Sequence, residues 1–457
     1  MRLITAPHSL DVPFHGTRSG TFPLTWGQTW VWDSVRSRAP YYADLSGSYI
    51  VEVLDGCDLT AISGALTTLL DRYETFRSRY SLSPDGTPHQ TVLAEGHLRV
   101  EVRDVDAADT QAAARTVENE FNNAPFTLPE LSLRASVVTS GGVPRYVVLC
   151  AFHMAMDCHG MVPVLEDFRD LMSGKPADAA HSAPPATTHP ADRALEERDT
   201  KGVQRSARGI RFWEQEIAKF PGDPLPWAGH RPEGPRYKTF AMHSAAVRVA
   251  SLELAEALGV STASVILAMT MSLLGRKTGN RMCGMILAAS HRYDAESMRY
   301  PGTLVQGVPV AVDVSDGPPH DLISRTHRAG MLAALAGHCH PQDLADALLA
   351  SYGEAAAARL ACVANLNLPT TAGNTEATGT GVTRAEAECL LAESRYEYVE
   401  GTPAENERFY LAAHGDPADF HITLRADTAV LTSADIVQFL RGLERALLDC
   451  LPYSVVD

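Results

Sequence analysis

The sequence predicts an α/β protein built from two lobes of similar size. At 457 residues the chain is too long for one ordinary hydrophobic core, and two domains of about 150 to 250 residues are expected. Strand-like and helix-like segments alternate along the first half, and the alternation returns after a stretch rich in Ala, Pro, His and polar residues. We therefore expect an N-terminal lobe at 1–173, a linker at 174–207 and a C-terminal lobe at 208–457.

Local patterns place the elements of the first half. Thr25 and Gln28 form the pattern of a capping box at the start of a helix. Asp58 is expected to cap the next helix, whose apolar residues recur at helical spacing. Gly141 and Gly142 are expected to turn one strand into the next. Apolar runs and alternations predict strands at 48–54, 98–102, 133–138 and 146–152.

The second half shows the same kinds of pattern. The spacing of apolar residues predicts helices at 208–220, 261–274 and 433–451. Loops are expected at 290–307 and in the Gly- and Thr-rich segment 370–383. Strands are expected at 282–289, 308–314, 409–414 and 420–426, with the last two paired.

Composition narrows the class of protein. An apolar fraction of 45% and a charged fraction of 21% are those of a folded soluble protein. The net charge of −16 argues against nucleic acid or an anionic membrane as the main partner. Eight scattered cysteines without a CxxC pair favour a reduced setting. No segment has the pattern of a signal peptide or a membrane span, so a cytoplasmic location is expected.

The most informative segment is 146–160. A run of apolar residues that reads as a buried strand stops at His153, and Asp157 follows four residues later. Gly160 then opens an amphipathic stretch at 161–172 that predicts a helix. A strand that delivers a histidine and an aspartate into a turn before a helix is a common support for a catalytic loop.

Taken alone, this pair of residues is a weak signal. The HxxxD spacing arises often by chance, and a buried histidine explains it equally well. A metal site that uses His153, Asp157 and His159 is disfavoured, because local geometry brings only two of them together and no third ligand stands at a recognisable spacing. The His338–His340 segment is also more typical of a loop than of a metal site. The sequence contains no GxSxG, GxGxxG or Walker pattern, which disfavours serine-hydrolase chemistry and a bound nucleotide.

The surroundings of this loop carry a resemblance to a known family. The segment Phe152-His153-Met-Ala-Met-Asp157-Cys158 resembles the HHxxxDG signature of the condensation domains of non-ribosomal peptide synthetases, which belong to a wider acyltransferase superfamily. Each further motif is degenerate, but their order and spacing are specific, and together they cover nearly the whole chain. They are 23–32 (resembling S-x-A-Q-x-R-x-W), 71–78 (R-H-E-x-L-R-T), 131–135 (P-L-x-R-A), 211–213 (Y-W), 284–292 (G-x-P-V-A-G-R), 302–306 (G-x-F-V-N) and 340–344 (H-Q-D).

The resemblance implies a fold and a reaction. The implied fold is two chloramphenicol acetyltransferase-like lobes that form a V with a central cleft and tunnel, with a crossover loop from the C-terminal lobe. Members join an acyl or aminoacyl thioester, carried on the 4'-phosphopantetheine of a carrier protein, to an amine or hydroxyl acceptor. No bound cofactor or metal is implied. A neutral imidazole suits this chemistry because its pKa lies near neutral pH, so it takes up the nucleophile's proton as the new bond forms.

The resemblance also assigns roles to residues. His153 aligns with the catalytic histidine, and Asp157 aligns with an aspartate that holds the loop together by an ion pair. Arg292, at the end of 284–292, is the implied partner, and a bidentate pair is expected. The candidates for lining the substrate tunnel are Phe152, Cys158, His159, Gln306 and Gln28.

Two positions depart from the signature. Phe152 replaces its first histidine, which the family uses more for structure than for catalysis. Cys158 replaces its glycine, where a side chain is expected to narrow the tunnel or to strain a backbone angle that glycine favours. A nucleophilic role for Cys158 is disfavoured because no cationic neighbour beyond the histidines is evident.

Three functions therefore stay open. The first is a free-standing, monomeric condensation enzyme that meets peptidyl or acyl carrier proteins in trans, which the lack of adenylation, carrier and thioesterase motifs favours. The second is a catalytically silent docking protein, which Phe152 and Cys158 favour. The third is an acyltransferase that uses a coenzyme A thioester. Because carrier proteins are usually acidic, as this chain is, a local basic or apolar docking patch is expected in the first case.

Overall fold

The chain folds into two compact units. The computed structural model describes residues 8–38, 45–128, 130–174, 188–225, 229–315, 317–366, 382–414 and 420–452. The first unit consists of Met1–Gln204 together with Ser290–Gln306, and the second of Arg205–Ala289 together with Gly307–Asp457. The segment Ser290–Gln306 thus packs with the first unit, although it connects two strands of the second.

Two sheets form the frame of the first unit. The larger sheet has the strand order β1-β6-β7-β8-β3, and only its β6–β7 pair is parallel. The smaller sheet has the antiparallel order β2-β5-β4. The strands are β1 (His8–His15), β2 (Gly20–Pro23), β3 (Ser46–Glu52), β4 (Ser78–Leu82), β5 (Pro88–Val92), β6 (Glu95–Asp104), β7 (Leu133–Ser140) and β8 (Val143–Phe152).

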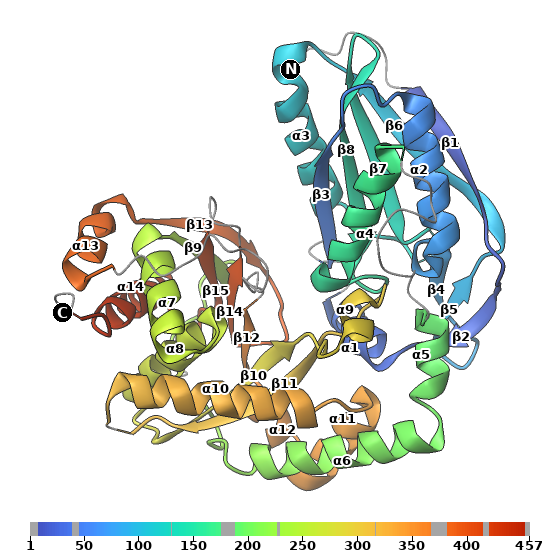
Figure 1. Cartoon of the computed structure of the whole chain (residues 1–457). Helices are drawn as coiled ribbons and strands as arrows, with labels where there is room; N and C mark the ends of the chain where they lie inside the picture. Colours follow the sequence, from blue (N-terminus) through green and yellow to red (C-terminus); the bar gives the residue numbers. More distant parts are fainter. Residues whose placement is uncertain are drawn as a thin grey trace. The chain divides into compact units, whose positions relative to one another are not determined.

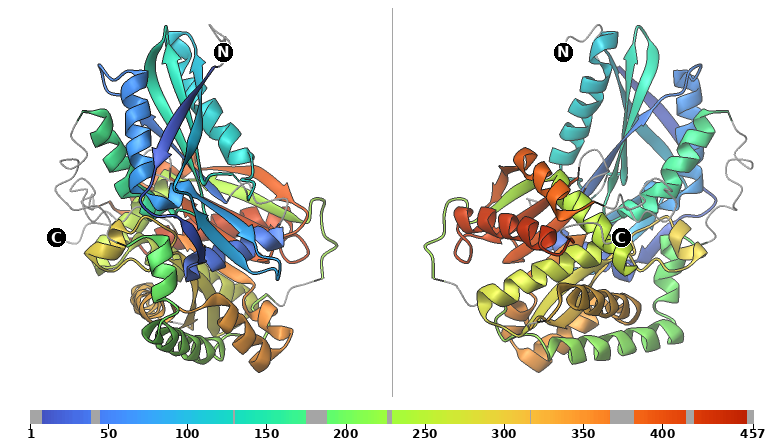
Figure 2. Two further views of the ribbon diagram at one scale, coloured as in Figure 1. Left: turned by 90° about the vertical axis from the view of Figure 1, so that its right-hand side faces the viewer. Right: turned by 60° about the vertical axis from the view of Figure 1, so that its left-hand side comes forward.

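Helices cover both faces of the larger sheet. Figures 1 and 2 show α2 and α4 on one face and α3 on the other. The α4 residues Val164 and Phe168, which the helical spacing predicts to be apolar contacts, are buried in the core formed with α2 and the sheet. The helices are α1 (Trp26–Arg38), α2 (Leu59–Arg72), α3 (Thr110–Asn123), α4 (Cys158–Met172), α5 (Pro190–Glu196) and α9 (Ala295–Arg299), with the 3-10 turns Glu74–Arg77 and Ala107–Asp109.

The second unit is built on one seven-stranded sheet. Its strand order is β11-β10-β12-β14-β15-β9-β13, with parallel pairs at β10–β12 and β12–β14 and antiparallel pairs from β14 to β13. The strands are β9 (Tyr237–His243), β10 (Met282–Ala289), β11 (Gln306–Asp313), β12 (Cys362–Leu366), β13 (Arg395–Thr402), β14 (Phe409–His414) and β15 (His421–Asp427).

The core of the second unit lies between this sheet and α7, α8 and α14. Its helices are α6 (Thr200–Ile217, which begins in the first unit), α7 (Ala245–Leu258), α8 (Thr262–Thr278), α10 (Pro319–Ala336), α11 (Pro341–Tyr352), α12 (Ala355–Arg359), α13 (Arg384–Cys389) and α14 (Ser433–Leu448), with the 3-10 turn Leu390–Glu393. Within the described residues, no single helix is long and apolar enough to cross a membrane. The consecutive helices α7 and α8 reach that length and hydropathy only together, and they are bent by 107°.

Several predicted elements are confirmed. Thr25 and Gln28 form the capping box, because each backbone N–H donates to the other's side-chain oxygen. Asp58 accepts from the N–H of Ala61 and caps α2. Gly141 and Gly142 have φ of 58° and 79°, the left-handed region that a tight hairpin turn requires. The predicted strands 282–289 and 409–414 have the observed bounds.

Two predicted loops contain helices. In the expected linker 174–207, α5 begins at Pro190 and α6 begins at Thr200. Proline suits the first turn of a helix, where its missing N–H costs nothing, and Asp192 accepts from the N–H of His189. In the expected loop 290–307, α9 spans Ala295–Arg299. Residues 370–381 lie outside the described residues, and Thr383 caps α13.

Candidate active site

The candidate site is the loop between β8 and α4. The end of β8 pairs with β3, where Phe152 is the register partner of Ser46, and the N–H of His153 donates to the carbonyl of Leu45. The N–H groups of Ala155 and Met156 then both donate to the carbonyl of Phe152, which turns the chain. The strand therefore ends at Phe152, and the next residue, His153, follows directly from a rigid support.

Buried hydroxyl groups fix the backbone of this loop. Thr303 Oγ1 donates to the carbonyl of His153 at 2.5 Å, and Thr75 Oγ1 donates to the carbonyl of Ala155 at 2.7 Å. Both threonines are at most 1% exposed. Because a buried carbonyl without a partner costs free energy, these two bonds stabilise the loop in one conformation.

Asp157 has a structural role, because hydrogen bonds occupy both oxygens of its carboxylate. As the N-cap of α4, its Oδ1 accepts from the N–H of Gly160 at 2.7 Å. The same oxygen accepts from Arg292 Nη2 at 2.9 Å, and Oδ2 accepts from the N–H of Leu304 at 2.8 Å. Asp157 is only 3% exposed, so its carboxylate holds the loop and is not placed to accept a proton from a substrate.

Arg292 completes this arrangement from the segment between β10 and β11. Nη2 donates to Asp157 and to the carbonyl of Gly302, and Nη1 donates to the carbonyls of Ser297 and Tyr300. The expected ion pair with Asp157 is present, but it is not bidentate. A single nitrogen contacts Oδ1, because backbone carbonyls occupy Nη1 and a backbone N–H occupies Oδ2.

Gly160 is the glycine on which the packing of this loop depends. A Cβ at this position would lie 2.7 Å from both Arg292 Nη2 and Met156 Sδ, and 2.9 Å from the carbonyl oxygen of Gly302. The backbone of Gly160 does not have positive φ. Glycine is therefore needed here for close approach and not for a special backbone angle.

The side chain of His153, the predicted catalytic residue, makes no hydrogen bond to the described residues, unlike the carboxylate of Asp157. Its ring is partly exposed, and its Nδ1 is buried without a hydrogen-bond partner in the described part of the chain. Nε2 is therefore the nitrogen available to a substrate. For Nε2 to accept a proton, Nδ1 must carry the ring hydrogen, and that hydrogen has no acceptor here.

Cys158 and His159 form the first turn of α4. The Cys158 side chain reaches solvent, and its backbone lacks the positive φ that only glycine favours, so the expected strain is absent. Surrounding protein atoms and the nearby Asp157 carboxylate raise the pKa of the Cys158 thiol to about 11. Burial lowers the pKa of the half-buried His159 below the ordinary imidazole value. Near neutral pH both groups are uncharged, and Cys158 is a poor nucleophile.

Two of the predicted tunnel-lining residues have other roles. Phe152 is 2% exposed and packs in a core cluster, stacked on Phe126 at 5.1 Å and edge-on to Tyr80 at 5.9 Å. Gln28 is fully buried. Its Oε1 accepts from Thr25, and its Nε2 donates to Tyr80 and Gln90. The strand pattern already indicated that Phe152 is buried, and the capping box already occupied Gln28.

The remaining predicted residue, Gln306, is also fully buried, at the start of β11. It therefore does not offer a side chain to a solvent-filled passage. The residues that fix the loop backbone and that the sequence patterns did not single out are Thr75 and Thr303. Thr75 and Thr303 lie inside the segments 71–78 and 302–306, whose resemblance to family motifs was the available signal.

In the described ranges, no three His, Cys, Asp or Glu side chains are arranged to hold a metal ion.

Comparison with known proteins decides the family. The family model of the condensation domain matches residues 19–450, which is nearly the whole chain. The chain belongs to the condensation domain family. The fold agrees, because solved condensation domains superpose on it throughout. The structure from the monacolin K polyketide synthase MokA covers 94% of this chain and 97% of its own, with a TM-score of 0.68 and 16% identity.

Two further structures have the same fold. The condensation domain that mediates chain release from the enacyloxin polyketide synthase covers 95% of this chain and 83% of its own, with a TM-score of 0.72 and 17% identity. The SgcC5 protein from Streptomyces globisporus, solved with (R)-(-)-1-(2-naphthyl)-1,2-ethanediol and sucrose, covers 95% of this chain and 100% of its own, with a TM-score of 0.68 and 18% identity.

Curated relatives of this condensation domain are large synthetases. The hybrid PKS-NRPS synthetase ucsA of an Acremonium species is 22% identical over 340 residues, which are 71% of this chain. The PKS-NRPS hybrid synthetase cheA of Chaetomium globosum is 24% identical over 205 residues, which are 45% of this chain. The matched parts span only 8% and 4% of those two proteins. The chain is thus homologous to condensation domains of natural-product synthetases.

Proposed function

We propose that this condensation domain is an acyltransferase that joins a carrier-bound acyl or aminoacyl thioester to an amine or hydroxyl acceptor. The observation that carries the proposal is the contrast around His153. The backbone and carboxylate of its loop are fixed by hydrogen bonds, while its ring makes none to the described residues and keeps Nε2 available. The substrate would arrive on the 4'-phosphopantetheine of a peptidyl or acyl carrier protein acting in trans, with no further cofactor.

The reaction balances with residues of the chain and the two substrates. The acceptor's nitrogen or oxygen attacks the thioester carbonyl, and His153 Nε2 takes the proton that the acceptor loses. The carbon–sulfur bond then breaks, and the same proton passes to the pantetheine thiol as it leaves. Since Nδ1 lacks an acceptor, we expect positioning of the two substrates to supply much of the rate acceleration and His153 to supply a smaller part.

Either an amide or an ester can form by this route. The SgcC5 protein has the same fold and was solved with a diol, which supports including hydroxyl acceptors in the test. The two departures from the family signature remove no group that this reaction uses. Phe152 packs in the core, and Cys158 leaves the loop unstrained.

The test compares donors, acceptors and two histidine variants. Carrier proteins loaded with candidate acyl groups, and the same acyl groups on coenzyme A, are incubated with amine and hydroxyl acceptors, and products are measured by mass spectrometry. We expect product from carrier-bound donors, and His153→Ala should lower its rate about 100-fold. His15→Ala is the matched control and should change the rate by less than about threefold, because His15 is exposed at the end of β1 and lies outside the candidate site. Undiminished turnover by His153→Ala would refute the role of this residue as the base. Product from the coenzyme A thioesters in the absence of carrier protein would show that coenzyme A, and not a carrier protein, delivers the acyl group.

A silent docking role is the second candidate, and one observation favours it. The missing acceptor at His153 Nδ1 means that nothing in the described residues sets the tautomer that a base requires. If this candidate is right, no loaded carrier gives product with any acceptor, while a partner protein binds equally well to the wild-type and the His153→Ala protein.

A further inference from the structure

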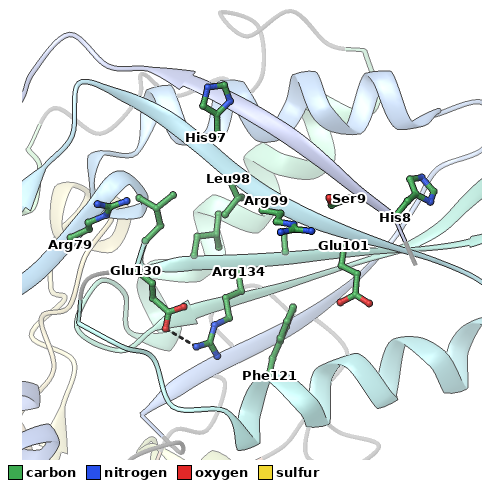
Figure 3. A pocket seen from close by; sticks show the side chains of 13 residues that line it. His8, Ser9, Arg79, His97, Leu98, Arg99, Glu101, Phe121, Glu130 and Arg134 are labelled. Atoms are coloured by element: carbon green, nitrogen blue, oxygen red, sulfur yellow. Dashed lines mark hydrogen bonds and ion pairs between the residues drawn. The ribbon is translucent and has the colours of Figure 1, made fainter. Parts of the chain in front are cut away.

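The two faces of the larger sheet in the first unit are covered unequally. Helices α2 and α4 cover one face, but on the other face α3 packs against β3, β7 and β8 only in part. A depression of about 880 Å³ lies on that second face, over β1, β6 and the start of β7. Figure 3 shows its lining side chains spread along the strands, from His8 at one end to Arg79 at the other.

The lining is unusually rich in cationic groups for this chain. Against a net charge of −16 for the whole protein, both carboxylates in the depression are already paired. Glu130 accepts from Arg134 at 2.7 Å, and Glu101 accepts from Arg103 at 2.9 Å. The charged and titratable residues that line it are His8, Arg79, His97, Arg99, Glu101, Glu130 and Arg134.

Arg134 forms a fixed wall of the depression. Its guanidinium lies 4.0 Å from the centre of the Phe126 ring. It also donates to the carbonyls of Ala124 and Pro125 and to Glu130. These contacts hold the planar group in one orientation, so its contribution to the shape of the depression is preorganised.

Arg79 and Arg99 carry the two guanidinium groups of the depression that make no ion pair with a described residue. Both are exposed, and neither forms an ion pair with any described residue. Asp11 is the register partner of Arg99 on β1, yet the two make no ion pair. Two guanidinium groups without ion pairs and a fixed third one along the same depression favour carboxylate or phosphate groups as ligands.

We propose that this depression, here named the arginine groove (Arg79, Arg99, Arg134 and the residues between them), binds an acidic segment of a partner protein. Partly exposed Leu131 and Phe121 lie beside the guanidinium groups. That mixture suits a chain that alternates acidic and apolar side chains better than it suits a small anion. The rest of this acidic chain repels such a segment, so the groove also steers it. The inference does not depend on the acyl-transfer proposal.

The test is binding of a fluorescein-labelled synthetic peptide that alternates Glu and Leu, followed by fluorescence anisotropy with the full chain. We expect Arg79→Glu/Arg99→Glu to weaken binding by about tenfold or more, as loss of two interface arginines does. Raising the salt from about 20 mM to about 200 mM should weaken binding of the wild-type protein far more than binding of the double variant. Because Arg99→Glu places a carboxylate opposite Asp11, Arg79→Gln/Arg99→Gln is measured as well. Both side chains are exposed, so this neutral variant should leave thermal unfolding unchanged and should still weaken binding.

Matched charge reversals keep the proposal falsifiable. Arg36→Glu and Arg115→Glu change side chains of the same unit that are 69% and 66% exposed and lie outside the groove, and binding should be retained. Equal loss in these controls would show that only net charge matters and would overturn the proposal. Binding of inorganic phosphate in competition with the peptide would assign the groove to small anions instead. A dimer in sedimentation velocity that Arg79→Glu/Arg99→Glu abolishes would assign it to a second copy of this chain.

Discussion

The two ends of the loop between β8 and α4 use their polar groups in different ways. At the Asp157 end, the carboxylate and Arg292 share hydrogen bonds with each other and with five backbone groups. At the β8 end, the side chain of His153 makes no hydrogen bond to any described residue. Asp157 and Arg292 therefore hold the loop, while the His153 ring is free to contact a substrate. Variants at the Asp157 end should lower the free energy of unfolding, and variants of His153 should lower turnover.

The largest effect on stability is expected for Arg292→Met. The variant leaves the Asp157 carboxylate buried without its cation, which typically costs about 3 to 5 kcal/mol. The free energy of unfolding in urea measures this loss. Arg115→Met is the control, since Arg115 is 66% exposed in its pair with Glu118, and such pairs contribute at most about 1 kcal/mol. A loss at Arg292 no larger than in the control would contradict the structural role of this end.

The reactivity of Cys158, the residue after Asp157, tests whether the α4 end of the loop supplies a nucleophile. With a pKa of about 11, only about one thiol in a thousand is ionised at pH 8. Iodoacetamide should therefore label Cys158 slowly near neutral pH, and the rate should rise about tenfold for each pH unit until about pH 11. The measurement uses Cys389→Ser protein, because Cys389 is the other exposed cysteine among the described residues. A rate that levels off below pH 9 would show a reactive thiolate.

Gly160→Ala tests whether close packing at the Asp157 end is required. The added Cβ would meet Arg292 Nη2 and the carbonyl of Gly302 at less than 3.0 Å, so a cost of about 1 to 3 kcal/mol is expected. Gly64→Ala in α2 is the control, since a Cβ there meets nothing within 4 Å, and alanine is the better helix former by about 1 kcal/mol. Equal stability of the two variants would show that the loop tolerates the shift.

The smallest effect is expected for Thr303→Val, which removes the hydroxyl that donates to the carbonyl of His153. A buried carbonyl left without its donor costs about 1 to 2 kcal/mol. Thr21→Val is the control because its hydroxyl bond to Thr91 is exposed. The variant also loosens the residue next to the proposed base, so turnover should fall along with stability. Unchanged stability and turnover would remove Thr303 from the description of the loop.

The sequence predicts local features of this fold better than distant ones. The capping box at Thr25 and the turn at Gly141 are specified by neighbouring residues, and both are confirmed. The strand orders mix parallel and antiparallel neighbours from distant parts of the chain, and no local pattern encodes that pairing. The sequence predicts a linker where α5 lies, because the short apolar face of this helix has no visible period. Pro190 and Asp192 are nevertheless good helix-start residues.

The same division holds at the candidate site. The loop and its His153 and Asp157 were found from the end of an apolar run. The hydroxyl groups that fix its backbone come from Thr75 and Thr303, which are 80 and 150 residues away from the carbonyls they bind. Contacts over such separations depend on tertiary packing. At Phe152 and Gln28 the motif position predicts a tunnel-lining side chain, whereas the buried strand and the capping box place these side chains in the interior.

The most direct test of the account measures the stability and the turnover of His153→Ala in the same preparation. Because the ring makes no hydrogen bond to the described residues and is partly exposed, the free energy of unfolding should stay within about 1 kcal/mol of the wild-type value. Product formation from a carrier-bound donor should fall about 100-fold. Unchanged turnover would contradict the claim that His153 takes the acceptor's proton. A loss of turnover that merely follows an equal loss of folded protein would contradict it as well.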